Sequence, residues 1–90
     1  MFATVAHVTD LDRFLQAFAT VGADKRREHG CRGAQVFRDP DQPDRVWCLF
    51  DWDEEDYAGF LADPGVPAVA RALALREPPV RVDPVADLDH

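Results

Sequence analysis

Two apolar-rich segments near the middle of the chain flank a short turn. Residues 33–38 and 45–52 are rich in β-branched and aromatic side chains, and residues 39–44 between them are only Asp, Pro and Gln. Proline fixes the backbone φ and aspartate side chains bond the backbone of a turn, so this pattern predicts a β-hairpin. If the turn is symmetric, Arg38 lies opposite Arg45.

This register divides the hairpin into two faces, because side chains alternate along a strand. The more apolar face, which we expect helices to cover, carries Gly33, Gln35, Phe37, Val46, Cys48, Phe50 and Trp52. The face that we expect to stay open carries Arg32, Ala34, Val36, Trp47, Leu49 and Asp51. Arg32 lies opposite Asp51 on this open face. A shift of one residue would exchange the two sets.

A strand and an amphipathic helix precede the hairpin. Residues 2–8 are β-rich and predict a strand, in which His7 shares a face with Ala3 and Val5. Thr9 or Asp10 caps a helix that we expect to run to Gly30. Its apolar stripe consists of Leu11, Phe14, Leu15, Phe18 and Val21. The basic residues in the polar run at its end, which include Arg26, are favoured by the negative end of the helix dipole. We expect His29 to point inward at this helix end.

A second helical region and a last strand follow the hairpin. Asp53 caps the first part of this region, and Asp63 with Pro64 restarts it until Pro78. Val80, Val82 and Val85 then predict a strand. Since Pro84 has no N–H to donate, we expect that strand at a sheet edge.

The resulting order, β-α-β-β-α-β, predicts an α+β fold of the ferredoxin-like kind. In this fold both helical regions cover one face of a four-stranded antiparallel sheet. Trp47, Leu49 and Val36 on the bare face would expose much apolar surface, so we expect a homodimer through that face. We expect a single domain over residues 1–86 and a flexible tail over 87–90.

Composition narrows the classes of partner. The net charge of −7 and the pI near 4.7 argue against nucleic acid and anionic membranes as partners. No membrane span or secretory signal pattern is present, which predicts a cytoplasmic protein. The chain contains no Ser and no Asn, which excludes a serine nucleophile. Cys31 and Cys48 fall out of register, so we expect free, mostly buried thiols.

Four residues are candidates for chemistry on the open face. His7 is a candidate general base, Arg32 can hold an oxyanion, and Trp47 can form a flat wall for an aromatic ring beside Asp51. The structural alternative is an Arg32–Asp51 ion pair, a Trp47 in the dimer core and a satisfied His7. We expect no metal site, because His7, His29 and His90 have no ligand spacing.

Several segments together resemble the small dimeric α+β-barrel proteins related to antibiotic biosynthesis monooxygenases. The similarity runs through residues 7–14, 26–38, 49–53 and 60–64, and ends at Pro78-Pro79-Val80. The resemblance implies two sheets paired into a barrel, with a pocket between sheet and helices in each protomer. It points to an uncharacterised branch in which the strand histidine, here His7, has a counterpart. The absence of Asn argues against the haem-degrading relatives.

The resemblance leaves the function open, since relatives of this fold differ in chemistry. We expect a protein that binds a small aromatic or hydrophobic molecule, with a cofactor-free monooxygenase as the enzymatic form and a polyketide cyclase or isomerase as its variant. The alternatives are a regulatory ligand-binding module and a structural or stress-associated dimer without activity. We expect no cofactor.

Overall fold

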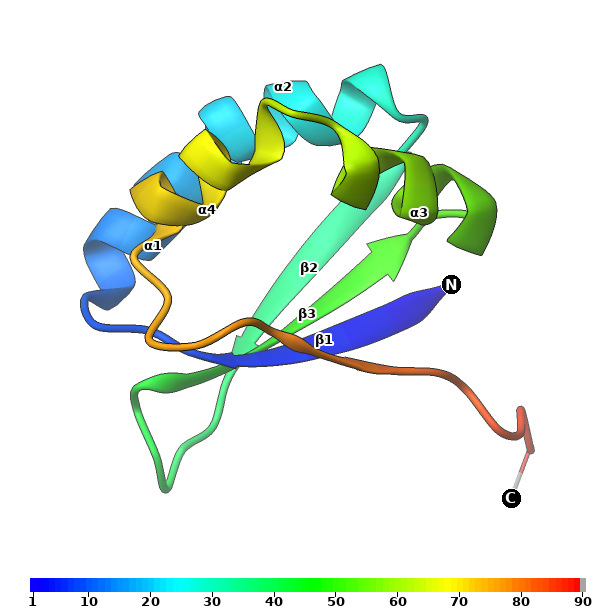
Figure 1. Cartoon of the computed structure of the whole chain (residues 1–90). Coiled ribbons are helices and arrows are strands. Elements are labelled where there is room, and N and C mark those ends of the chain that lie inside the picture. Colours follow the sequence, from blue (N-terminus) through cyan, green and yellow to red (C-terminus); the bar gives the residue numbers. More distant parts are fainter. Residues whose placement is uncertain (90) are drawn as a thin grey trace.

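The computed structural model describes residues 1–89 as four antiparallel strands and four helices. Their order is β1 (Phe2–His7), α1 (Leu11–Ala19), α2 (Val21–Glu28), β2 (Gly33–Arg38), β3 (Arg45–Asp51), α3 (Glu54–Ala62), α4 (Val66–Leu73) and β4 (Val80–Val82). The strands form one sheet in the order β2-β3-β1-β4. The helices lie on one side of that sheet and leave the other side bare (Figure 1). This is the predicted ferredoxin-like arrangement, with each helical region divided in two.

The predicted faces are correct for β3 and wrong for β2. Val46, Cys48 and Phe50 are buried under the helices, whereas Trp47 alternates with them onto the bare face. On β2, however, Val36 pairs with Cys48 rather than with Trp47, so the hairpin register differs from the prediction by one residue.

The turn explains this shift. The Oδ1 atom of Asp39 accepts hydrogen bonds from the backbone N–H groups of Asp41 and Gln42. The backbone N–H of Arg45 donates to the carbonyl of Gln42 at 2.9 Å, and Arg38 pairs with Val46. Arg45 is therefore opposite Asp39, whose backbone N–H donates to the Arg45 carbonyl at 3.0 Å, and not opposite Arg38. As a consequence, Gly33, Gln35 and Phe37 lie on the open face, and Ala34 and Val36 face the helices.

The first helical region breaks at Thr20, which the sequence did not predict. Asp10 is the N-cap, since its Oδ1 accepts from the Arg13 N–H at 3.1 Å. The Thr20 hydroxyl donates to the carbonyl of Gln16 at 2.8 Å, and α2 starts at the next residue. Phe14 and Phe18 of the predicted stripe are buried, but Leu15 and Val21 are exposed. Gly30 ends the region as predicted, with a φ of 81° that a side chain would disfavour.

The second helical region also differs in its boundaries. α4 starts at Val66 rather than at Pro64, because the carboxylate of Asp63 folds back on the N–H of Gly65 at 2.7 Å. It ends at Leu73, before Pro78, because Ala74 adopts a left-handed φ of 55°. β4 is a sheet edge as predicted. The predicted tail includes His90, which lies outside the described residues.

The core lies between the helices and the covered face of the sheet. Its buried members are Phe2, Ala6, Val8, Phe14, Phe18, Val46, Cys48, Phe50, Trp52 and Tyr57. Trp52 is fully buried, and its indole N–H donates to the carbonyl of His29 at 2.8 Å. This bond links the sheet to the end of α2. Within residues 1–89, no helix is long and apolar enough to cross a membrane.

Candidate functional site

A cavity of about 90 Å³ lies between the helical layer and the covered face of the sheet. Aromatic rings form much of its wall. The cavity is lined by the aromatic residues Phe14, Phe18, Phe50, Trp52, Tyr57 and Phe60 and by the polar residues Thr4, Arg26 and Cys48, among others. Among the described residues that line it, none is a carboxylate or an imidazole. The cavity therefore offers apolar surface and one positive charge.

Arg26 provides that charge from α2. Its guanidinium carbon lies 3.8 Å from the centre of the Phe18 ring and 6.0 Å from that of Phe50. Within residues 1–89, the ion pairs on this helix are made by Lys25 and Arg27, and no carboxylate contacts the Arg26 guanidinium. Burial lowers the pKa of Arg26 from its usual value, but a guanidinium stays charged in a protein. An arginine held this way can bind an anion.

The other polar groups at the cavity are neutral at neutral pH. Burial raises the pKa of the Cys48 thiol to about 11, and it also raises the pKa of Tyr57. Cys48 is thus a poor nucleophile. Both cysteines are free, as predicted. The cavity can hold a molecule that is already an anion, but it contains no group suited to remove a proton from a neutral one.

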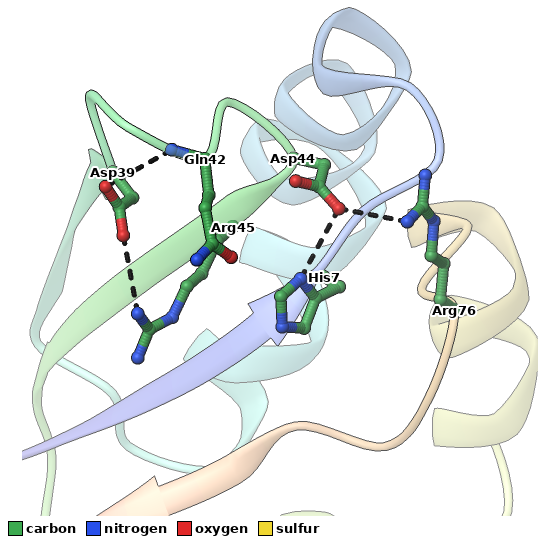
Figure 2. A network of polar contacts seen from close by, with 6 residues as sticks. All are labelled: His7, Asp39, Gln42, Asp44, Arg45 and Arg76. Atoms are coloured by element: carbon green, nitrogen blue, oxygen red, sulfur yellow. Dashed lines mark hydrogen bonds and ion pairs between the residues drawn. The ribbon is translucent and has the colours of Figure 1, made fainter.

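His7 lies on the other side of the sheet. Its Nδ1 is 3.4 Å from Oδ2 of Asp44, and the same oxygen accepts a hydrogen bond from Arg76 at 3.0 Å (Figure 2). His7 also lines a shallow hollow of the open face, whose other members include Val5, Arg45, Trp47 and Val80. In this hollow the guanidinium of Arg45 lies 5.2 Å from the centre of the Trp47 ring. The structure thus brings His7 and Trp47 to one hollow.

Arg32 and Asp51 form a separate group. The Nε and Nη2 atoms of Arg32 lie 3.1 and 3.0 Å from one oxygen of Asp51, and Nη2 is also 3.2 Å from Asp53. The Arg32–Asp51 contact was predicted, and it is exposed. Asp51 is six residues along β3 from Arg45, which pairs with His7, so His7 and Asp51 are about 20 Å apart. The four candidate residues therefore do not form one constellation, and their roles stay predictions.

Sequence reasoning missed Arg26, although a signal for it was present. Phe14, Phe18, Gly22 and Arg26 are spaced by four residues, which places them on one helical face. Arg26, however, lies within a run of charged residues, and such a run is typical of a helix end that is exposed to solvent. Gly22 leaves room for this side chain, because a Cβ at Gly22 would lie only 3.1 Å from Nη1 of Arg26.

A second polar cluster joins the end of α2 to the loop between α3 and α4. The Nε2 atom of His29 lies 2.8 Å from Asp63, and Lys25 Nζ lies 3.3 Å from Asp63 and 2.8 Å from Glu28. The hydrogen bond from His29 is the main reason that the pKa of Asp63 falls to about 2, with smaller effects of the Gly65 N–H and Lys25. Glu28, His29 and Asp63 approach each other closely enough to ligate a metal ion. Because the ammonium of Lys25 already lies between the two carboxylates, we assign the cluster a structural role.

Comparison with known proteins identifies similar sequences and folds. The sequence model of the antibiotic biosynthesis monooxygenase family matches residues 6–71, which is more than half of the chain. A search of curated proteins gave no match.

Solved structures of the same fold come from several organisms. A protein of Bordetella bronchiseptica, provisionally assigned as an antibiotic biosynthesis monooxygenase, superposes with a TM-score of 0.80 at 18% identity over 97% of this chain and 95% of that one. SnoaB, a cofactor-independent oxygenase from Streptomyces nogalater, superposes with a TM-score of 0.74 at 24% identity over 99% and 95%. A conserved protein from Methanosarcina mazei gives 0.67 at 15% identity over 90% and 85%. At these identities the likeness shows a common fold.

Proposed function

Because the chain belongs to the antibiotic biosynthesis monooxygenase family, we propose that it binds a small aromatic molecule, ionised as a phenolate or enolate, in the cavity between the sheet and the helices. Arg26 contacts the oxyanion, and the rings of Phe18 and Phe50 contact the aromatic body. The observation that carries this proposal is the Arg26 guanidinium, which lies among aromatic rings without a carboxylate partner in the described chain.

The enzymatic form of the proposal is oxygenation without a cofactor. An electron-rich phenolate or enolate can transfer electrons from its ring carbon to dioxygen; one oxygen atom stays on that carbon as a carbonyl, and the other leaves as water with the two hydrogens that the substrate loses. Arg26 stabilises the ionised substrate, which must enter as an anion because no base lines the cavity. The fold shared with SnoaB, a cofactor-independent oxygenase, supports this reading.

The functional unit is a homodimer that pairs the open sheet faces. Four exposed apolar residues gather on that face: Phe37, Trp47, Val80 and Val82. Soluble monomers rarely expose an apolar patch of this kind. A second copy of the chain carries the same patch, which is what a two-fold symmetric interface requires.

The ionisation of 4-nitrophenol tests the role of Arg26. This phenol ionises near neutral pH with a change in visible absorbance, so a spectrophotometric titration gives its pKa when bound. We expect the protein to lower that pKa by about one unit, because the charge of Arg26 favours the phenolate. Arg26→Met should remove the shift, and Arg26→Lys should keep part of it. Arg13→Met, at an exposed position of α1, is the matched control. An undiminished shift in Arg26→Met would reject the proposal.

Oxygenation needs a second measurement. Dioxygen uptake and carbonyl formation are followed with a series of hydroxylated aromatics, and uptake in the wild type should fall about tenfold or more in Arg26→Met. Equal dioxygen uptake by the wild type and Arg26→Met would mean that the site at Arg26 does not carry out the oxygenation, even if it binds the phenolate.

General-base chemistry on the open face is a second candidate function. It is favoured by the contact between His7 and Asp44, which can orient the imidazole at a hollow that Trp47 also lines. It predicts that His7→Ala abolishes turnover while Arg26→Met retains it. The proposal at Arg26 predicts the opposite pattern.

A further inference from the structure

A second hollow lies against the outer side of Arg26. It has a volume of about 190 Å³ and is lined by Ala23, Arg26, Arg27, Cys31, Gly33 and Ala34. Arg26 therefore borders both this outer hollow, between α2 and β2, and the aromatic cavity. The outer hollow is polar and contains two arginines, whereas the cavity is apolar.

The size of the cavity indicates that its ligand extends into the outer hollow. A cavity of about 150 Å³ is known to hold benzene, and the cavity here measures about 90 Å³. A ring that binds at Arg26 therefore fits more easily if part of the molecule lies on the outer side. That part meets a second cation, because Arg27 lines the same hollow.

Arg27 has donors left for a ligand. Its Nη1 is bound to Asp24 at 2.9 Å, and a guanidinium carries five N–H donors in all. Its side chain is exposed, so it can reorient toward an anion without breaking the core. The carboxylate of Asp24 weakens this positive charge but leaves the outer hollow with two arginines against one acid.

We propose that the ligand of this site is an aromatic hydroxy acid, whose phenolate binds Arg26 at the cavity and whose carboxylate lies in the outer hollow and binds Arg27. This inference rests on the proposed function, since it requires the phenolate at Arg26. It adds the second anionic group of the substrate and the residue that recognises it.

Two probes that differ by one carboxylate test the inference. They are 4-nitrophenol and 5-hydroxy-2-nitrobenzoate, which is the same phenol with a carboxylate beside the nitro group. Their affinities are measured by titration calorimetry at a pH where both phenols are ionised. We expect the added carboxylate to tighten binding about tenfold, as for one charge-assisted contact. Arg27→Met should abolish that gain without changing the affinity for 4-nitrophenol, and Asp24→Ala should enlarge the gain because it releases Arg27.

The outcomes separate the inference from the proposed function. If 4-nitrophenol binds in an Arg26-dependent manner but the carboxylate gives no gain, or a gain that survives Arg27→Met, the inference is wrong and the phenolate site stands. If neither probe binds the wild type, both are wrong.

Discussion

The two faces of the sheet contain similar apolar residues in different surroundings. On β3, Val46 is 0% exposed and its neighbour Trp47 is 36% exposed, because only one face lies under the helices. The covered face includes a cavity with a cation, Arg26, that lies next to aromatic rings and has no ion-pair partner within residues 1–89. On the open face several charged groups are paired with one another, as in the contact of His7 and Arg76 with Asp44 (Figure 2).

This difference separates two kinds of recognition. An unpaired charge in an apolar cavity strongly favours a ligand of opposite charge, since few other contacts satisfy it. Paired charges around a half-exposed apolar surface are typical of a protein interface rim. This difference supports the proposal that the small molecule binds at the covered face and the second protomer at the open face.

The largest expected contrast is in stability. Trp52→Ala removes a fully buried ring that packs on Tyr57 and Phe60 and bonds the carbonyl of His29, so it should lower the free energy of unfolding by about 4 kcal/mol. Trp47→Ala should cost about 1 kcal/mol in the monomer. Urea denaturation at several protein concentrations measures both, because a dimer adds a concentration-dependent contribution. If both variants lose the same free energy of unfolding at low protein concentration, the two faces of the sheet do not differ in burial as we describe.

The association of protomers should show the next largest effect. Replacing Phe37 and Trp47 by Glu puts unpaired charges into the proposed interface and should weaken dimerisation by about two orders of magnitude. Sedimentation equilibrium measures the dissociation constant. Leu61→Glu is the control, since Leu61 is 57% exposed on α3, away from the open face. A wild type that sediments as a monomer would contradict the proposed homodimer.

A smaller effect concerns the polar cluster that fastens the helical layer. The pKa of Asp63 is about 2 in the folded protein, below its ordinary value of 3.8, so the unfolded chain binds more protons there between these values. The stabilisation by the ionised Asp63 is complete above about pH 4 and is lost as the pH falls through 2. Asp63→Asn should flatten this part of the stability profile, measured by urea denaturation from pH 2 to 5. Asp12→Asn, which replaces an exposed acid of α1, is the control and should leave the profile unchanged. If the profile of Asp63→Asn has the same slope as that of the wild type, the structural role of the Asp63 cluster is wrong.

The sequence was sufficient for the fold because hydrophobic patterning and element order agree with it. The alternation along β3 placed Val46, Cys48 and Phe50 under the helices correctly. The last strand is at the sheet edge as predicted, but β4 ends at Val82, so Pro84 and Val85 lie outside it. The register of β2 was not predictable from patterning alone. It depends on the hydrogen bonds of the Asp39 side chain within the turn, in which Asp39 rather than Arg38 comes opposite Arg45.

The candidate site was less predictable than the fold. Arg26 stands in a charged run, and whether its side chain turns inward depends on the break at Thr20 and on the room that the missing side chain of Gly22 leaves for the guanidinium. Neither feature has a strong local signal. The predicted candidates on the open face are polar residues of adjacent strands, but strand length keeps Asp51 far from His7.

The most direct test is a crystal structure of the protein at neutral pH with 2-bromo-4-nitrophenol, which is a phenolate at that pH and in which anomalous scattering locates the bromine. Our account predicts the bromine between the helices and the covered face of the sheet, with the phenol oxygen at hydrogen-bond distance from the guanidinium of Arg26. A bromine in the hollow beside His7 and Trp47, with the cavity at Arg26 unchanged, would contradict it.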